Sequence, residues 1–378
     1  MPNRVIVSKL GGPEVLKYEN YDLPKNVEEN MVRINQTSIG INYIDTYHRT
    51  GIYPLPVEIP FCLGVEAAGD VIEIGDNVSN LKVGDRVAYS FSPPIGAYCE
   101  VRDFDAQRVV KLPEYISNDE AASILLQGMT VEYLFERLYK LQKDEVFLFH
   151  AAAGGVGLIA SQWAKSIGAK MIGTVSTDEK ASLAKENGCE FTINYKEEDV
   201  HSNVLKLTNN EGVNVVYDGV GKDTFDISPK CLKFRGLMVS FGQSSGMVND
   251  VNLHSTFNPK SLYYTRPTLM HYIRNSEELT ECSNKLFSKI KNKEIPGNVI
   301  YEDDKCFALE DINPQAPVHI LIIPHKEIAK ISDSTPEDKE LLGHLLLVSK
   351  TIAQKYELEN NYRLIINNGA GAGQSVFH

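Results

Sequence analysis

The hydrophobic pattern divides the chain into three parts. In residues 1–125, short runs of Val, Ile and Ala alternate with turns of Gly, Asp and Pro, which predicts closely spaced strands and a small β-barrel. In residues 126–262, short apolar runs alternate with helical segments, which predicts βαβ units and a doubly wound parallel sheet. Residues 286–378 have a different pattern, with expected strands at 318–323 and 362–367 around a long amphipathic helix at 336–356.

The middle part can be assigned element by element. Its expected strands are residues 146–150, 170–175, 191–195, 213–218 and 237–242. Its expected helices are residues 119–138, 158–167, 178–186 and 200–207. Ser176 and Glu179 have the spacing of a capping box at the start of the helix at 178–186.

The sequence AAAGGVG follows the strand at 146–150 and precedes a helix. A strand, a glycine turn and a helix in this order form the phosphate-binding corner of dinucleotide-binding folds. Gly154 and Gly155 have no Cβ, so their backbone can approach a diphosphate closely, whereas Gly157 allows the helix to pack tightly on the strand. The unpaired N–H groups of the helix start favour an anion. A glycine cluster alone is weak evidence, because an ordinary tight β–α turn has the same residues.

The end of the next strand bears on the choice of cofactor. An acidic residue about 20 residues beyond the glycines would bind the ribose hydroxyls of NAD. Here Ser176 and Thr177 stand at that point, and Lys180 follows one helical turn later. A hydroxyl and an ammonium group suit a 2′-phosphate, which favours NADPH over NADH. Asp178 and Glu179 are the competing feature, since either could face the ribose.

Charge and cysteine usage limit the partners. The 50 acidic and 38 basic residues give a net charge of -12, which argues against nucleic acid and anionic membranes as partners. The six cysteines are scattered, with no CxxC pair, and the N-terminus has no apolar signal segment. We therefore expect a cytoplasmic protein with neither disulfides nor a structural zinc.

Several motifs together resemble one family: INYIDTYHRTGIYP, GAYCE, HAAAGGVGLIASQWAKSIGAKMIGTVST, VVYDGVG, GLMVSFGQSSG and YYTRPTL. Residues 1 to about 285 resemble the zinc-free medium-chain dehydrogenase/reductases, namely NADPH quinone oxidoreductases of the zeta-crystallin type. The resemblance implies a GroES-like β-barrel catalytic domain (1–125, with 263–285 returning to it), a Rossmann NADPH-binding domain (126–262) and a homodimer paired through the strand around 262–265.

The same resemblance implies the site residues and the reaction. Asn42, Tyr47 and Tyr53 match residues that line the nicotinamide and substrate cleft. The matched cofactor contacts are Asn42, Tyr47, Thr130, Gly154, Gly155, Val156, Ser176, Lys180, Tyr195, Phe241, Gly242, Ser244 and Arg266. The implied activity is hydride transfer from NADPH to a quinone, with protons from solvent or a cleft tyrosine. No residue stands out as an indispensable general acid, so no catalytic residue is assigned.

The expectation that no metal takes part depends on one short motif. Zinc alcohol dehydrogenases of this superfamily carry a GHE motif that supplies a metal ligand, and this chain has Gly64-Val65-Glu66 at that place. Valine cannot bind a metal. A quinone is already a good hydride acceptor and needs little polarisation, so proximity supplies much of the catalysis.

From about residue 286 the chain resembles a different family. LFSKIKNKEIPGNVIYEDDKCFALEDINPQAPVHILIIPHKEI and NYRLIINNGAGAGQSVFH resemble histidine-triad (HIT) nucleotide-binding proteins of the Hint type. The resemblance implies an α+β segment that binds a purine nucleotide. Asp311 and Ile312 match residues at the ribose and base, Asn367 and Ser375 match residues near the phosphate, and His378 matches the first histidine of the triad.

The expected nucleophile is the second histidine of that triad, and the sequence stops at the first. We therefore expect an incomplete, inactive HIT segment joined to a reductase that also lacks a further helix and its last strand, as in a chimaeric or truncated gene product. Two other functions stay open at this point. The chain could be a HIT-type nucleotide-binding module with the reductase as passenger, or an NADPH-binding fusion protein without catalysis.

Overall fold

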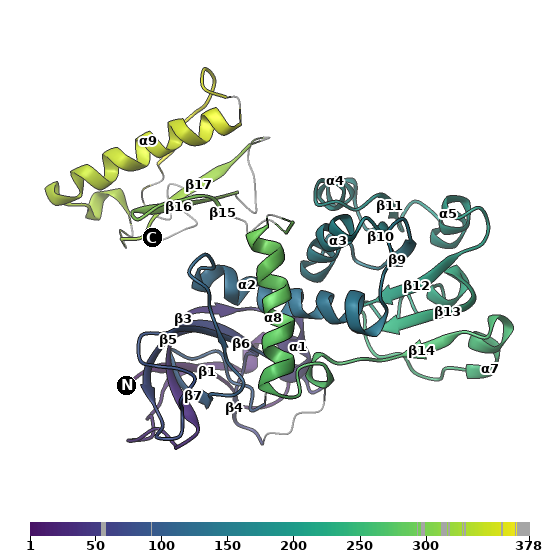
Figure 1. The fold of residues 1–378 in the computed structure, drawn as a ribbon, viewed down its shortest axis with the longest axis horizontal. Coiled ribbons are helices and arrows are strands. Elements are labelled where there is room, and N and C mark those ends of the chain that lie inside the picture. Colours follow the sequence, from purple (N-terminus) through teal and green to yellow (C-terminus); the bar gives the residue numbers. More distant parts are fainter. Residues whose placement is uncertain are drawn as a thin grey trace. The chain divides into compact units, whose positions relative to one another are not determined.

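The computed structural model describes residues 1–378 except 54–57, 92, 293, 296–298, 311–315, 317, 327, 329, 357, 367 and 369–378. The chain forms two compact units, Met1–Ile295 and Pro296–His378 (Figure 1). No helix in these described residues is both long and apolar enough to cross a lipid bilayer.

The first unit begins with two small antiparallel sheets. One has the strand order β7-β3-β5-β6-β8, and the other has the order β2-β1-β4. Their elements are β1 (Asn3–Val7), β2 (Leu16–Asn20), β3 (Met31–Gly40), α1 (Tyr43–Thr50), β4 (Phe61–Cys62), β5 (Glu66–Ile74), β6 (Arg86–Ser90), β7 (Val101–Asp105) and β8 (Val110–Lys111). The alternating pattern of the sequence agrees with this arrangement, since β3 and β5 bury their apolar positions in one core.

A six-stranded parallel sheet with the order β11-β10-β9-β12-β13-β14 makes up the rest of this unit. The strands of this sheet and the helices of the same region are α2 (Asn118–Glu132), β9 (Val146–Phe149), α3 (Gly155–Ile167), β10 (Lys170–Val175), α4 (Asp178–Glu186), β11 (Phe191–Asn194), α5 (Val200–Leu207), β12 (Val213–Asp218), α6 (Ser228–Cys231), β13 (Leu232–Ser240), α7 (Leu253–Phe257) and β14 (Tyr263–Thr265). Its central strands are almost fully buried, as expected for a sheet covered on both faces. The predicted doubly wound sheet is therefore confirmed.

Four details of this unit differ from the sequence-based expectations. Helix α3 begins at Gly155, three residues before the expected start, and β13 begins at Leu232 instead of 237. The expected capping box of Ser176 and Glu179 is wrong: Thr177 is the N-cap of α4, and its side chain accepts a hydrogen bond from the amide of Lys180. Residues 263–265 pair with β13, so they extend the Rossmann sheet although the expected domain boundary left them outside it.

Helix α8 (Ser276–Lys291) closes the first unit by packing on α2. The close approach depends on Gly128 of α2, where an added Cβ would lie 2.5 Å from Leu286 Cδ1. Glu132 of α2 is fully buried and forms ion pairs with Arg137 (2.6 Å) and Lys285 of α8 (3.0 Å). These two cations neutralise a carboxylate that would otherwise be costly to bury.

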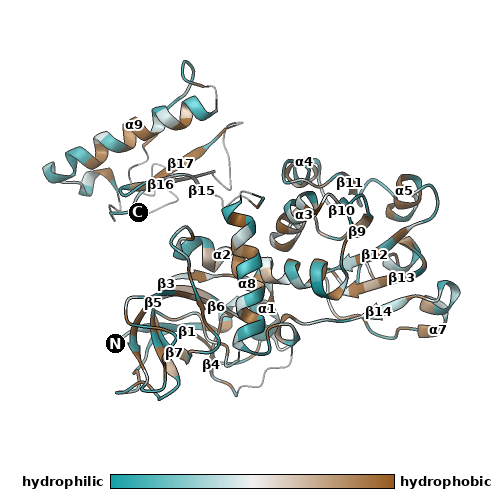
Figure 2. Ribbon diagram, viewed as in Figure 1, coloured by the Kyte–Doolittle hydropathy of each residue, from teal (hydrophilic) through white to brown (hydrophobic). Residues whose placement is uncertain are grey.

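The second unit contains an antiparallel sheet of the order β15-β16-β17 and one long helix. Its elements are β15 (Val299–Glu302), β16 (Cys306–Glu310), β17 (Ile320–Pro324) and α9 (Lys339–Lys355). Figure 2 shows polar and apolar residues alternating along α9, and its apolar side contributes Val348 and Ile352 to a core with Cys306 and Ala308. The strand expected at 362–367 is wrong for residues 362–366, which pair with no strand of the described chain.

Candidate functional site

The glycine corner joins β9 to α3. Gly154 is the N-cap of this 13-residue helix, and no side chain caps it, so its first amides are left for another acceptor. A Cβ added at Gly155 would come no closer than 3.7 Å to a neighbour, which is the Gln127 side chain. A Cβ at Gly157 would lie 2.4 Å from the carbonyl oxygen of Ala151. Gly155 thus keeps a surface open, whereas the tight packing predicted at Gly157 is confirmed.

The polar residues beyond β10 lie together at the adjacent edge of the sheet. Lys180 Nζ donates a hydrogen bond to Ser176 Oγ (3.3 Å). Tyr195 follows β11, the strand next to β10, its amide donates to the carbonyl oxygen of Val175 (3.1 Å), and its side chain is exposed. The backbone therefore brings the residues that follow β10 and β11 to one edge of the sheet, and their hydroxyl, ammonium and phenol groups are of the kinds that would suit a 2′-phosphate.

Asp178 and Glu179 are the acidic residues that could compete for the ribose. Asp178 and Glu179 are exposed in the first turn of α4. Hydrogen bonds from its own amide and from the Thr177 hydroxyl lower the pKa of Glu179. This carboxylate therefore interacts with the start of α4, which it helps to stabilise, and it is not directed at the Ser176 hydroxyl.

A second group of predicted residues lies at the start of α1. Asn42 precedes that helix, is buried, and donates through Nδ2 to Glu66 Oε2 (2.7 Å). Its Oδ1 accepts from Gln127 Nε2 (3.1 Å), and Gln127 is the residue that lies beside Gly155. A chain of polar side chains therefore links α1 to the glycine corner.

Glu66 is the buried end of this series of hydrogen-bonded side chains. Besides Asn42, its carboxylate accepts from the amide of Leu126 at 2.6 Å. Burial raises the pKa of Glu66 to about 8, so the carboxyl holds a proton over much of the neutral range. Each oxygen of Glu66 accepts one hydrogen bond and the side chain has no access to solvent, so Glu66 fixes the orientation of Asn42.

Two tyrosines of α1 face the loop that follows β13. The Tyr43 hydroxyl donates to the carbonyl oxygen of Ser244 (3.1 Å), and the Tyr47 hydroxyl accepts from the amide of Gln243 (3.3 Å). Burial raises the pKa of Tyr47 to about 12, so its phenol is neutral at physiological pH and retains a proton. Tyr53 packs edge-on against buried His48, with ring centroids 5.8 Å apart.

Arg266, which follows β14, fixes the same loop. It donates to the carbonyl oxygens of Ser240 (3.1 Å) and Gly242 (3.4 Å) and to the side chain of Gln243 (2.7 Å). Gly242 approaches Gly219 so closely that a Cβ would lie 2.5 Å from its carbonyl oxygen. Arg266 and Gly242 therefore shape the loop.

The remaining predicted residues have plain structural surroundings. Phe241 packs against Phe149, with ring centroids 5.5 Å apart. The side chain of Val156 joins the main core, and the Thr130 hydroxyl donates to the carbonyl oxygen of Leu126 (2.8 Å). A role for these residues in binding a cofactor stays a prediction.

Sequence reasoning missed Gln127, Glu66 and the Tyr43 contact. A signal existed for Gln127, because it lies three residues before Thr130 on one helix and so shares its face. Glu66 stands out in the sequence only as part of the GVE motif, and its burial depends on contacts that the sequence does not reveal. The HIT candidates Asp311, Ile312, Asn367, Ser375 and His378 lie outside the described residues.

Two known domain families match the first unit of the chain. Residues 28–134 match the alcohol dehydrogenase GroES-like domain, and residues 155–289 match the zinc-binding dehydrogenase domain. Quinone oxidoreductase 1 of Escherichia coli is 50% identical over 290 residues, which cover 77% of this chain and 88% of that protein. This chain belongs to the quinone oxidoreductase family. The expected membership of the medium-chain dehydrogenase/reductase superfamily is confirmed.

Solved structures show the same fold. The Escherichia coli quinone oxidoreductase determined with NADPH has a TM-score of 0.75 and 50% identity, and covers 78% of this chain and 89% of its own. A mycobacterial protein, also determined with NADPH, has a TM-score of 0.73 and 38% identity, with coverages of 78% and 90%.

The C-terminal unit has relatives of its own. Residues 292–378 match the HIT domain. An uncharacterised HIT-like protein of Synechocystis is 55% identical over 93 residues, which cover 25% of this chain and 82% of that protein. The chain therefore joins a quinone oxidoreductase part to a HIT domain, and the two resemblances inferred from its motifs are confirmed.

Proposed function

We propose that this protein is an NADPH-dependent quinone oxidoreductase. The observation that carries the proposal is the placement of Ser176, Lys180 and Tyr195 together at the ends of β10 and β11, beside an open glycine corner. A 2′-phosphate is the group that distinguishes NADPH from NADH, and this cluster suits it. The family relationship and the relatives determined with NADPH support the same cofactor.

The residues present fit this cofactor. The amides of Gly155 and Val156 at the start of α3 would hold the diphosphate, with the helix dipole favouring its charge. The amide of Gly154 donates to the carbonyl oxygen of Ala151 (3.0 Å), so Gly154 would contribute its close backbone approach. NADPH when bound supplies the hydride. Asn42 and Tyr47, on the α1 side, line the nicotinamide and quinone cleft in this proposal, and Arg266 holds the loop of Phe241, Gly242 and Ser244 on the far side.

We propose that the reaction needs no metal. At the position of the metal-ligating histidine of zinc relatives this chain has Val65, whose side chain is buried and apolar. The neighbouring Glu66 is occupied by Asn42 and the amide of Leu126. Protons come from solvent or from Tyr47, whose phenol stays neutral at physiological pH.

Oligomeric state and location are also proposals. Strand β14 is the edge of the parallel sheet, and its Tyr263 and Tyr264 are exposed, which supports pairing of two sheets into a homodimer. All six cysteines are free, which supports a reducing cytoplasmic location.

For the C-terminal unit, the HIT match supports binding of a purine nucleotide at Asp311 and Ile312. Titration with a purine nucleotide, with Asp311→Asn as the weakened variant, tests that role.

The reductase proposal is tested with the purified full chain. NADPH consumption is followed in the presence of a simple benzoquinone, beside NADH at the same concentration. We expect turnover with NADPH and a kcat/KM at least about tenfold lower with NADH, because one charge-assisted contact is worth at least about 1.5 kcal/mol. Absence of turnover with tight NADPH binding would instead identify a non-catalytic NADPH-binding protein, and this proposal would be wrong.

A further inference from the structure

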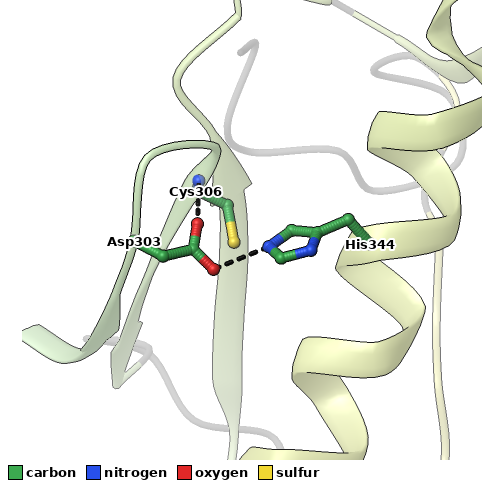
Figure 3. Close-up of side chains that lie close together, drawn as sticks. All are labelled: Asp303, Cys306 and His344. Carbon is green, nitrogen blue, oxygen red and sulfur yellow. Dashed lines mark hydrogen bonds and ion pairs between the residues drawn. The ribbon is translucent and has the colours of Figure 1, made fainter.

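Three side chains of the C-terminal unit, Asp303, Cys306 and His344, bring metal-ligating atoms together. A carboxylate oxygen, Sγ and an imidazole nitrogen lie within 4.8 Å of one another. Figure 3 shows the sulfur of Cys306 beside the Asp303 carboxylate and the His344 ring. Within the residues that the structure describes, no second group of three such side chains meets the same spacing.

The local fold holds these residues in place. Asp303 lies in the turn between β15 and β16, and Cys306 is the first residue of β16. Asp303 Oδ1 accepts from the amides of Lys305 (2.8 Å) and Cys306 (3.0 Å). His344 comes from α9, and its Nε2 lies 2.6 Å from Asp303 Oδ2. Core contacts between Cys306 and Val348 hold the helix against the strand. The donors therefore come from two elements that pack together without any ion.

The chemistry of the group selects the ion. Thiolate, imidazole and carboxylate are the ligands that zinc combines, whereas Mg²⁺ and Ca²⁺ take oxygen ligands. Cys306 is fully buried, but the side chains of Asp303 and His344 are 20% and 25% exposed. An ion can therefore enter from solvent, and a water molecule can supply a fourth ligand.

We propose that Asp303, Cys306 and His344 form a zinc-binding site with one further position for water. Burial raises the pKa of Cys306 to about 11, so without metal the thiol is protonated, and binding of Zn²⁺ forms a Zn–S bond and releases one proton to solvent. His344 exchanges its hydrogen bond to Asp303 for a bond from Nε2 to the ion. Tyr301, which donates to Asp303 Oδ2 (2.6 Å), positions that carboxylate from outside the ligand set.

A bound ion would cross-link the start of β16 and the turn before it to α9. This cross-link would stabilise a small unit whose described sheet has three strands. This role does not depend on the reductase proposal.

Titration of the metal-free full chain with Co²⁺, a spectroscopic substitute for Zn²⁺, tests the site. We expect one equivalent to produce a thiolate-to-cobalt charge-transfer band together with tetrahedral d–d bands, and Zn²⁺ to remove both. Cys306→Ser should abolish the charge-transfer band, and His344→Gln should weaken binding by more than the roughly ten- to hundredfold typical of outer-shell changes. Tyr301→Phe should lower the affinity for Co²⁺ by about ten- to hundredfold.

Cys62→Ser is the matched control, because Cys62 is the one cysteine that is not fully buried and it lies in the other unit. It should leave the cobalt spectrum unchanged. Cobalt binding without a thiolate band, or parent-like affinity in His344→Gln, would overturn the site. His344 is partly exposed, so this variant decides the question even if Cys306→Ser does not fold.

Discussion

The two sides of the proposed cofactor site are built in opposite ways. The phosphate side comes from one continuous segment, since Gly154, Ser176, Lys180 and Tyr195 lie on consecutive βα units. The cleft side joins segments that are distant in sequence: Tyr47 of α1 meets Gln243 after β13, 196 residues away. Local chain geometry thus determines the first, and long-range packing determines the second.

Substitutions on the two sides should affect the stability of the protein differently. On the phosphate side, Gly155, Lys180 and Tyr195 can be altered with little effect on packing, because Gly155 has open space beside it and the other two side chains are exposed. The cleft side is a buried hydrogen-bonded network, so a change there also affects stability and its pH dependence. The four predictions below test this difference, beginning with the largest expected effect.

Replacement of Gly155 by Val should cause the largest loss. The new side chain would occupy the open surface at the start of α3, so we expect NADPH affinity to fall by more than about a hundredfold, or about 2.7 kcal/mol. Calorimetric titration with NADPH measures this loss.

Gly157→Ala is the matched variant. Its Cβ would lie 2.4 Å from the carbonyl oxygen of Ala151, so we expect the free energy of unfolding to fall by about 1–3 kcal/mol. Denaturant unfolding checks both variants. If Gly155→Val lost as much stability as Gly157→Ala, the division into an open and a packed glycine would be wrong.

Lys180→Ala should lower the affinity for NADPH by roughly ten- to a hundredfold and leave the affinity for NADH nearly unchanged, because a hydrogen bond to a charged group is worth about 1.5–3 kcal/mol. Lys185→Ala, in the last turn of the same helix, is the control and should affect neither cofactor. Dissociation constants for both cofactors give the answer. Equal losses for NADPH and NADH would remove the 2′-phosphate assignment.

Glu66→Gln should change how stability depends on pH. Burial raises the pKa of Glu66 from 4.5 to about 8, so the native state binds a proton that the unfolded state has released between these values. The stability of the parent chain, measured relative to that of the variant at each pH, should therefore fall as pH rises from about 4.5 to 8, by at most about 1.4 kcal/mol per pH unit. Denaturant unfolding across this range measures it. Parallel pH profiles would show that Glu66 is ionised in the native state.

Tyr47→Phe should have the smallest effect. Its hydroxyl accepts one hydrogen bond from Gln243, worth about 0.5–1.5 kcal/mol, so we expect kcat/KM for the quinone to fall by about two- to tenfold. Steady-state rates at saturating NADPH measure it. A loss beyond about a hundredfold would make Tyr47 the main proton donor, because general acid catalysis contributes about that much or more.

The same contrast explains what the sequence could predict. The periodicity of residues 170–218 places β10, α4, α5 and β12 at their observed bounds, because each element buries its own apolar face. The network of Glu66, Asn42 and Gln127 was not predicted, since its members meet only after β5, α1 and α2 have packed. Residues 362–366 are apolar except for Arg363 and were expected to form a strand, but a strand also needs a partner, and the described residues offer none.

The central claim is that the glycine corner and the cluster beyond β10 hold NADPH. Calorimetric titration of the full chain with NADPH and with NADH, using Gly155→Val as the blank for any nucleotide bound elsewhere, tests it most directly. We expect the parent chain to bind one equivalent of NADPH with an affinity at least about tenfold above that for NADH, and we expect the variant to lose this binding. Equal affinities for the two cofactors, or NADPH binding that survives in Gly155→Val, would contradict it.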